Sequence, residues 1–209
     1  MKTEEKFKEL AQITARQLRN FWDLGDNEEA KLLSAEAAYE KTIYCLSNTK
    51  NKYFQGYVDP CHSVMYCIWL YWLSRYVYET SGGSLADKVY YLNKVMHSVD
   101  ILYAVELPRQ WSCEHPLGSV MGRAKYSDGF FFNQGCTVGG NYDRLGNLYY
   151  PVIGKNVTMH SNAKILGKSI IGDNCIISAN TYIINAEIPN NSMIFGCSPS
   201  LIIKKNNRI

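Results

Sequence analysis

The sequence shows no strong charge imbalance, no export signal and no apolar run of membrane length. A formal net charge of +3 over 209 residues is too small to indicate a nucleic-acid partner. The first ten residues are charged and lack the apolar core of a secretory signal. The most apolar segment, Val64–Val77, contains Arg75 and is too short to span a bilayer. We therefore expect a cytoplasmic protein that neither inserts into a membrane nor binds nucleic acid.

The cysteines form no recognisable framework. There are seven of them, an odd number, and they are scattered without a CxxC pair. In a chain without an export signal, such cysteines are typical of reduced thiols rather than disulfides. No metal site is expected from them.

The first half of the chain has helical periodicity. Apolar residues recur three or four positions apart, as in Phe7–Ile13 and in Val64–Tyr78. A further periodic stretch, Leu85–Met96, follows the glycine-containing segment TSGGS. This pattern predicts an N-terminal helical domain over residues 1–99.

The second half has a strict six-residue period. A helix cannot keep this period on one face, because six residues turn it through about 600°. A coil of three short strands, one hexapeptide per side, explains it, with one large and one small side chain per repeat pointing inward. An ordinary β-sandwich is the alternative, but its strands would show a period of two. The large positions are Ile153, Met159, Ile165, Ile171, Ile177 and Ile183, and the small or β-branched ones are Val157, Ala163, Ser169, Cys175 and Thr181.

The same period appears upstream, at Val120, Tyr126, Phe132 and Val138. Between the two runs, residues 141–150 (NYDRLGNLYY) break the register and are predicted to form a loop that leaves the β-helix, a common place for functional residues. The fold class is therefore α+β, with helices followed by a parallel β-helix over residues 100–203. Residues 204–209 are interpreted as a short basic tail.

Five short motifs stand in order along the second half of the chain: VDI at 99–101, EHPLGSVMG at 114–122, TVGG at 137–140, NAKILG at 162–167 and IGDN at 171–174. In sequence and order they resemble serine acetyltransferases of the hexapeptide-repeat acyltransferase family. With the preceding helices, the resemblance covers about two-thirds of the chain. It implies a left-handed β-helix, acetyl-CoA as co-substrate, and homotrimers with active sites between subunits, which the helices could pair into a dimer of trimers.

His115 is the predicted catalytic base. Acetyl transfer from a thioester to a hydroxyl needs a base for the alcohol proton, and histidine suits this because its pKa lies near neutrality. His115 comes one residue after Glu114, which lies six positions before Val120 in the upstream six-residue pattern. Its side chain should therefore face outward. The resemblance matches it to the family's catalytic histidine and matches Asp100, fifteen positions earlier, to the aspartate that orients it.

His160 is the rival histidine and also follows a grid position, which places it outward. It stands where the family usually has a glycine along the coenzyme. The candidate CoA-binding residues are Gly139, Gly140, His160, Ser161, Asn162, Ala163, Lys164 and Gly167. Small residues there would let the pantetheine arm lie close to the backbone, and Lys164 could meet a phosphate, although the same residues also suit tight corners of the fold.

The acceptor pocket departs from the family pattern. The family's Arg-His pair before a proline is replaced by Tyr149 and Tyr150, and the acidic residue beside the base is Glu114 rather than aspartate. Phenols remove the cationic partner of a carboxylate and offer a flat face that suits a sugar. A sugar or glycan-precursor hydroxyl and L-serine are therefore both candidate acceptors, with N-acetylation of an amino sugar a third. Asp59, before the long apolar segment, is a weaker candidate contact.

Three further hypotheses concern the mechanism, a loss of catalysis and a protein partner. Cys113, close to His115, suggests an acyl-cysteine intermediate. A catalytically inactive scaffold or partner-binding protein would keep the β-helix without the reaction, although the presence of both Asp100 and His115 argues against it. Serine acetyltransferases dock a C-terminal isoleucine into the cysteine-forming enzyme, and this chain ends in Ile209.

Overall fold

The computed structural model describes residues 3–49 and 52–207 and divides into two compact units. Residues 1–97 and 102–104 form the helical unit, and residues 98–101 and 105–209 form the β-helix unit. The predicted boundary after residue 99 thus falls within Ser98–Ile101, which belongs to the β-helix unit. Ile209 and its predicted docking role lie outside the described residues.

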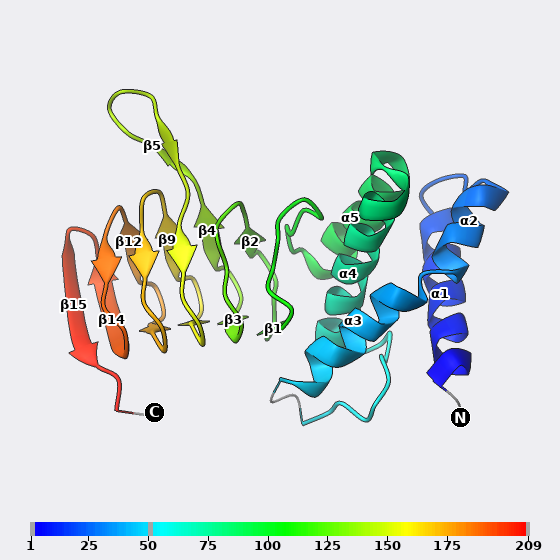
Figure 1. Ribbon diagram of the computed structural model, residues 1–209, viewed down its shortest axis with the longest axis horizontal. Coiled ribbons are helices and arrows are strands. Elements are labelled where there is room, and N and C mark those ends of the chain that lie inside the picture. The colour runs from blue at the N-terminus through cyan, green and yellow to red at the C-terminus, as the bar shows by residue number, and fades with distance from the viewer. Residues whose placement is uncertain (1–2, 50–51, 208–209) are drawn as a thin grey trace. The chain divides into compact units, whose positions relative to one another are not determined.

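Among the residues that the structure describes, the helical unit has five helices, drawn in blue to green in Figure 1. The fourth is apolar on nearly all sides, with every residue from Val64 to Ser74 buried, because it packs against both the third and the fifth helix. In the part of the chain that the structure describes, no helix is long and apolar enough to span a membrane. The helices are α1 (Thr3–Arg19), α2 (Asp26–Leu33), α3 (Glu36–Ser47), α4 (Ser63–Ser81) and α5 (Gly83–His97).

The second unit is a parallel β-helix of short strands, yellow to red toward its end in Figure 1. Its first face is β1 (Trp111–Cys113), β3 (Phe130–Phe132), β8 (Thr158–Met159), β11 (Ile176–Ile177) and β14 (Ser192–Cys197). Its second face is β2 (Val120–Met121), β4 (Thr137–Gly139), β9 (Lys164–Leu166) and β12 (Tyr182–Ile184). Its third face is β7 (Val152–Ile153), β10 (Ile170–Ile171) and β13 (Glu187–Ile188).

The six-residue period is confirmed by the interior of this unit. Every predicted inward position from Ile153 to Ile183 is at most 2% exposed. In-register pairs such as Ile165 with Ile183 stack the same side-chain type from coil to coil. This repetition fills the narrow interior without a void, as close packing requires.

The upstream grid was wrong at its first position. Val120 is 40% exposed, whereas Met121 is buried. The strand register explains the shift, because Val120 pairs with Thr137 and Met121 with Val138. Paired residues here are seventeen positions apart, one fewer than the eighteen of three hexapeptides.

The first coils are filled by aromatic rings instead of aliphatic side chains. Trp111 stacks on Phe132 with ring centroids 6.1 Å apart and an interplanar angle of 7°. Phe130 contacts both Phe132 and Tyr126. Trp111, Phe130 and Phe132 are at most 1% exposed, so these rings fill the interior of the first coils.

Asparagines with positive φ make the corners. Only glycine and asparagine adopt this left-handed conformation at low cost, and the side chains form ladders between coils. Asn156 donates to Asn174 at 3.0 Å, and Asn174 donates to Asn191 at 2.9 Å. A second ladder joins Asn162 to Asn180. The corners are thus set by side-chain amides as well as by backbone turns.

Residues 141–150, predicted as a loop, form a hairpin that extends from the β-helix (Figure 1). Its strands are β5 (Asn141–Tyr142) and β6 (Leu148–Tyr149). The predicted tail needs correction, because Lys204 and Lys205 end the strand β15 (Ser200–Lys205), which pairs antiparallel with β14. This strand covers the last parallel edge, which would otherwise leave its backbone groups unpaired.

Candidate active site

The segment that carries Asp100 lies beside the turn that carries His115. Asp100 forms a parallel bridge with Val120 on the free edge of β2, and its N–H donates to the Ser119 carbonyl at 2.9 Å. The Gly118 N–H donates to the Ser98 carbonyl at 2.8 Å. His115, with φ of 50°, is exposed in the turn between β1 and β2. Its outward position agrees with the prediction.

The His115 turn stacks on the turns that hold part of the predicted CoA site. The Gly135 N–H donates to the Leu117 carbonyl, and the Asn162 N–H donates to the Gln134 carbonyl, both at 2.9 Å. Successive coils lie about 4.8 Å apart. The corner of the β-helix between the first and second faces therefore holds the turn of His115, the turn of Gln134 and Gly135, and the turn of Ser161 and Asn162 in three successive coils. We call this corner the histidine corner.

His160 supplies a second imidazole to the histidine corner. Its Nδ1 lies 3.2 Å from the amide oxygen of Asn133, which accepts a hydrogen bond when the ring proton is on Nδ1. The His160 carbonyl accepts from the thiol of Cys136 at 3.2 Å, and burial raises the pKa of that thiol. His160 is half-buried. Asn133, which orients it, has no distinctive motif in the sequence.

Other predicted CoA-binding residues are used by the fold itself. The Ala163 side chain faces the interior, its N–H donates to His160 and its carbonyl accepts from Thr137. Gly167 is buried and its N–H donates to the Gly139 carbonyl at 3.0 Å. Lys164 donates to the Asn162 carbonyl at 3.2 Å, which keeps its ammonium at the histidine corner.

The hairpin packs on Gly140 at a different corner, between the second and third faces. A Cβ at Gly140 would lie 2.8 Å from Cε1 of Tyr150 and 2.9 Å from Cδ1 of Leu148. At Gly139 the nearest atom would be 3.8 Å away. Gly140 thus gives room to the hairpin side chains. Within one chain, His115 and the predicted acceptor residues Tyr149 and Tyr150 belong to different corners.

A cation lies at the base of the hairpin. Lys168 Nζ sits 5.5 Å from the centroid of the Tyr149 ring. The sequence argument that the Tyr149–Tyr150 pair leaves no positive charge here missed this lysine, because it comes from the next coil. The hairpin itself is ordered by Asp143, whose pKa is lowered by hydrogen bonds from the Asn147 side chain and backbone.

The remaining candidates have clear structural positions. Glu114 is exposed and its N–H donates to the Phe132 carbonyl at 3.0 Å. Asp59 belongs to the helical unit, where its carboxylate accepts from the Cys61 N–H at 2.8 Å just before α4. Cys113 is buried and faces the prism interior in register with Phe132, which gives the thiol a packing role. Across residues 3–49 and 52–207, no group of three or more His, Cys, Asp or Glu side chains is placed to hold a metal ion.

Residues 150–185 match the protein family described as bacterial transferase hexapeptide, with six repeats. The matched residues run through the regular coils described above. The β-helix that the six-residue period predicted therefore carries the hexapeptide repeats of this family model over residues 150–185.

Serine acetyltransferases are among the similar proteins. That of Staphylococcus xylosus is 27% identical over 152 residues, which cover 72% of this chain and 69% of that protein. That of Mycobacterium tuberculosis is 24% identical over 143 residues, or 68% and 62%. The Neisseria gonorrhoeae serine acetyltransferase structure has a TM-score of 0.74 at 20% identity and covers 96% of this chain and 80% of that one. A serine acetyltransferase in complex with CoA has a TM-score of 0.69 at 20% identity, with coverage of 93% and 83%. These matches confirm the predicted resemblance and support the predicted transferase class.

Proposed function

We propose that this chain is an acetyl-CoA-dependent O-acetyltransferase in which His115 is the general base. The observation that carries the proposal is the histidine corner, where the turn of His115 stacks on the turn of Gln134 and Gly135, which in turn stacks on that of Ser161 and Asn162. The turn of His115 is also hydrogen-bonded to the segment of Asp100. The serine acetyltransferase relatives, one of them solved with CoA, support the same reaction class.

The reaction follows from the chemistry of these groups. The neutral imidazole of His115 takes the hydroxyl proton of the acceptor while that oxygen attacks the thioester carbonyl. The carbon–sulfur bond then breaks, and the proton passes to the departing thiolate of CoA. Asp100 holds the imidazole in the tautomer that accepts this proton. CoA lies along the histidine corner, where Ser161, Asn162 and Lys164 present polar groups.

The acceptor is a small molecule with a hydroxyl group, and the hairpin selects it. Tyr149 and Tyr150 offer the flat faces that suit a sugar, whereas Lys168 beside Tyr149 offers a partner for a carboxylate such as that of L-serine. Lys168→Gln separates the two. In this variant a carboxylate acceptor loses a charge-assisted hydrogen bond, and its binding weakens by about 1.5–3 kcal/mol. The KM of a neutral sugar does not change.

The assembly we propose is a homotrimer, in which the hairpin of one subunit reaches the histidine corner of the next. The location of the two halves of the site on different corners of one chain supports it. Mixing an inactive His115→Ala chain with an inactive hairpin variant should restore activity, because some sites then combine two intact halves. A cytoplasmic location is part of the same proposal.

The deciding experiment measures CoA release from acetyl-CoA with a panel of acceptors that includes L-serine, neutral sugars and amino sugars. Acceptor-dependent release that is lost in His115→Ala supports the enzyme. Absence of release with every acceptor, despite CoA binding, would favour the inactive scaffold instead.

A further inference from the structure

The helical unit has a pocket of its own, between the segment that follows α1 and the middle of α5. Its volume of about 530 Å³ lies within the range of small-molecule sites, roughly 300–1,000 Å³. Four of the six side chains that line it are aromatic and two are charged, a composition typical of ligand pockets. We call it the aromatic pocket. Its lining residues, all within the helical unit, are Phe21, Trp22, Asp87, Lys88, Tyr90 and Tyr91.

Three of the rings form an angled wall of the aromatic pocket. Trp22 lies 5.7 Å from Tyr91, centroid to centroid, at an interplanar angle of 78°, and 5.5 Å from Phe21 at 49°. Phe21 is 49% exposed and Tyr91 is 50% exposed, so the rings contact one another and still leave faces open to solvent. Exposed apolar groups that gather in a patch mark binding surfaces, whereas isolated ones do not. The wall therefore indicates a ligand that covers aromatic faces.

The charged side chains leave the aromatic pocket negative. The Lys88 ammonium is bonded to both carboxylate oxygens of Glu28, at 2.8 and 2.9 Å, and to the Asp23 carbonyl at 3.3 Å. Its charge is thus neutralised by Glu28. Asp87 forms no ion pair with any residue that the structure describes. The carboxylate of Asp87 is therefore the uncompensated charge of the pocket.

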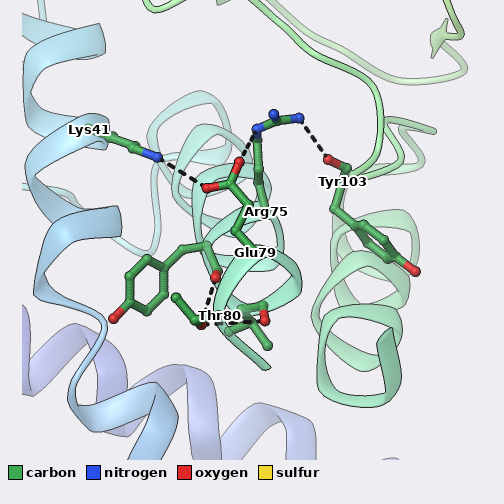
Figure 2. Close-up of polar contacts among 7 residues, drawn as sticks. Lys41, Arg75, Glu79, Thr80 and Tyr103 are labelled. Atoms are coloured by element: carbon green, nitrogen blue, oxygen red, sulfur yellow. Dashed lines mark hydrogen bonds and ion pairs between the residues drawn. The ribbon is translucent and has the colours of Figure 1, made fainter. Parts of the chain in front are cut away.

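The Asp87 carboxylate is fixed through one of its oxygens. The Tyr103 hydroxyl donates to Oδ1 of Asp87 at 2.8 Å. Tyr103 belongs to the helical unit and is held there by the network of Figure 2, in which Arg75 donates to the Tyr103 carbonyl at 3.2 Å and pairs with Glu79 at 2.9 Å. The bond from Tyr103 uses only Oδ1, which leaves Oδ2 for a ligand.

The ring geometry favours a compact cation over a flat ligand. Trp22 and Tyr91 are nearly perpendicular and already in contact, so a planar ring cannot stack between them. A rounded ammonium head can lie in the angle between the rings, within the distance of about 6 Å at which aromatic faces attract cations. Tyr90 of the same pocket already has such a partner, because the Lys94 ammonium lies 5.3 Å from its ring centroid.

We propose that the aromatic pocket binds an organic cation with a compact alkyl-ammonium head, which contacts the rings of Trp22 and Tyr91 and pairs with the Asp87 carboxylate. Aromatic walls beside a carboxylate supply both the attraction for positive charge and the apolar surface that alkyl groups need. The inference is independent of the proposed acetyl transfer, because the pocket shares no residue with the histidine corner. It gives the helical unit a binding function.

The test is calorimetric titration of the full chain, without acetyl-CoA, with choline and with 3,3-dimethyl-1-butanol, in which a carbon replaces the charged nitrogen. Choline should bind saturably and roughly 10-fold more tightly than its neutral analogue, because only the cation gains from the rings and from Asp87. Tyr91→Ala and Asp87→Asn should each weaken choline binding roughly 3- to 10-fold, and the asparagine can still accept the bond from Tyr103. No saturable binding of choline, or equal affinity for the two ligands, would overturn the proposal.

Tyr53→Ala is the matched control. Tyr53 is a 60% exposed tyrosine of the same unit that does not line the pocket, and its ring lies 5.0 Å from the Lys52 ammonium. This variant should bind choline like the wild type, and thermal unfolding shows whether each variant is folded. Equal choline affinity in Tyr91→Ala and Tyr53→Ala would contradict the location of the site. If Tyr91→Ala instead dissociates an assembly in sedimentation and keeps its choline affinity, the wall is a contact between subunits and the proposal fails.

Discussion

Gly118 donates its N–H to the carbonyl of Ser98 at 2.8 Å, and with the bond from the Asp100 N–H to the Ser119 carbonyl it joins the turn of His115 to the segment of Asp100. The two residues are separated by a stretch that forms β1 and enters the first coil. These backbone bonds hold side by side the two segments whose residues the resemblance to serine acetyltransferases pairs as base and orienting aspartate.

Gly140→Ala should impair acceptor use while leaving the fold intact. The new methyl group would lie 2.8 Å from the Tyr150 ring and 2.9 Å from Leu148, so these side chains must move, although flexible hairpin side chains can do so at modest cost. We expect a several-fold increase in the acceptor KM, roughly the effect of a 1 kcal/mol perturbation, with the KM for acetyl-CoA unchanged. Gly139→Ala is the control, since its nearest contact would be 3.8 Å. Equal kinetic effects at both glycines would contradict the role given to the hairpin.

Asn174→Ala should destabilise the β-helix by about 2–3 kcal/mol, from two lost hydrogen bonds and the strain of a left-handed residue without an amide. Asn174 has φ of 57° and stands in the middle of the ladder from Asn156 to Asn191. Asn174→Gly loses the hydrogen bonds but keeps the conformation, so it should be roughly 1 kcal/mol less destabilised than the alanine variant. Denaturant unfolding measures the free energy of unfolding of both variants. If the alanine variant is as stable as the glycine variant, backbone strain at residue 174 does not contribute.

Stability should fall as the pH drops from about 6.5 to about 4, in part because of His97. Burial lowers the pKa of His97 to about 4, and its Nδ1 lies 2.7 Å from the Asn93 amide oxygen. Between these pH values the unfolded chain binds a proton at this histidine and the folded chain does not, so the folded state loses up to about 3 kcal/mol. The loss is complete below pH 4 and absent above the unfolded pKa.

Comparison with His97→Gln isolates this effect, because carboxylates contribute equally to both proteins. The free energy of unfolding of the variant should change less between pH 7 and pH 4 than that of the wild type. Parallel pH profiles would show that His97 is accessible to protons in the folded state.

The regular coils could be predicted from the sequence because the large inward positions recur every six residues. From Ile153 to Ile183 these positions hold isoleucine or methionine, and each is at most 2% exposed. The first coil lacks this regularity. Its seventeen-residue spacing moved Val120 outward and Met121 inward, and its large aromatic rings replace the aliphatic pattern.

The sequence offers candidate site residues only where a motif carries them. Asp100 and His115 lie in motifs of the resemblance, and the backbone bonds of the first coil place their segments together. Lys168 and Asn133 contact side chains that are distant in the chain, those of Tyr149 and His160, and no local pattern distinguishes them. The sequence likewise does not distinguish Gly140, which packs against Tyr150 and Leu148 of the hairpin, from Gly139, which does not.

The most direct measurement compares acetyl transfer by the wild-type, His115→Ala and His160→Ala proteins with the best acceptor of the panel. Both histidines lie at the histidine corner, so the pair distinguishes the base from its neighbour. We expect His115→Ala to lower kcat by roughly 10²- to 10⁴-fold while CoA still binds, and His160→Ala to change mainly the KM for acetyl-CoA. Full activity in His115→Ala, or a larger loss of kcat in His160→Ala, would contradict the assignment of His115 as the base.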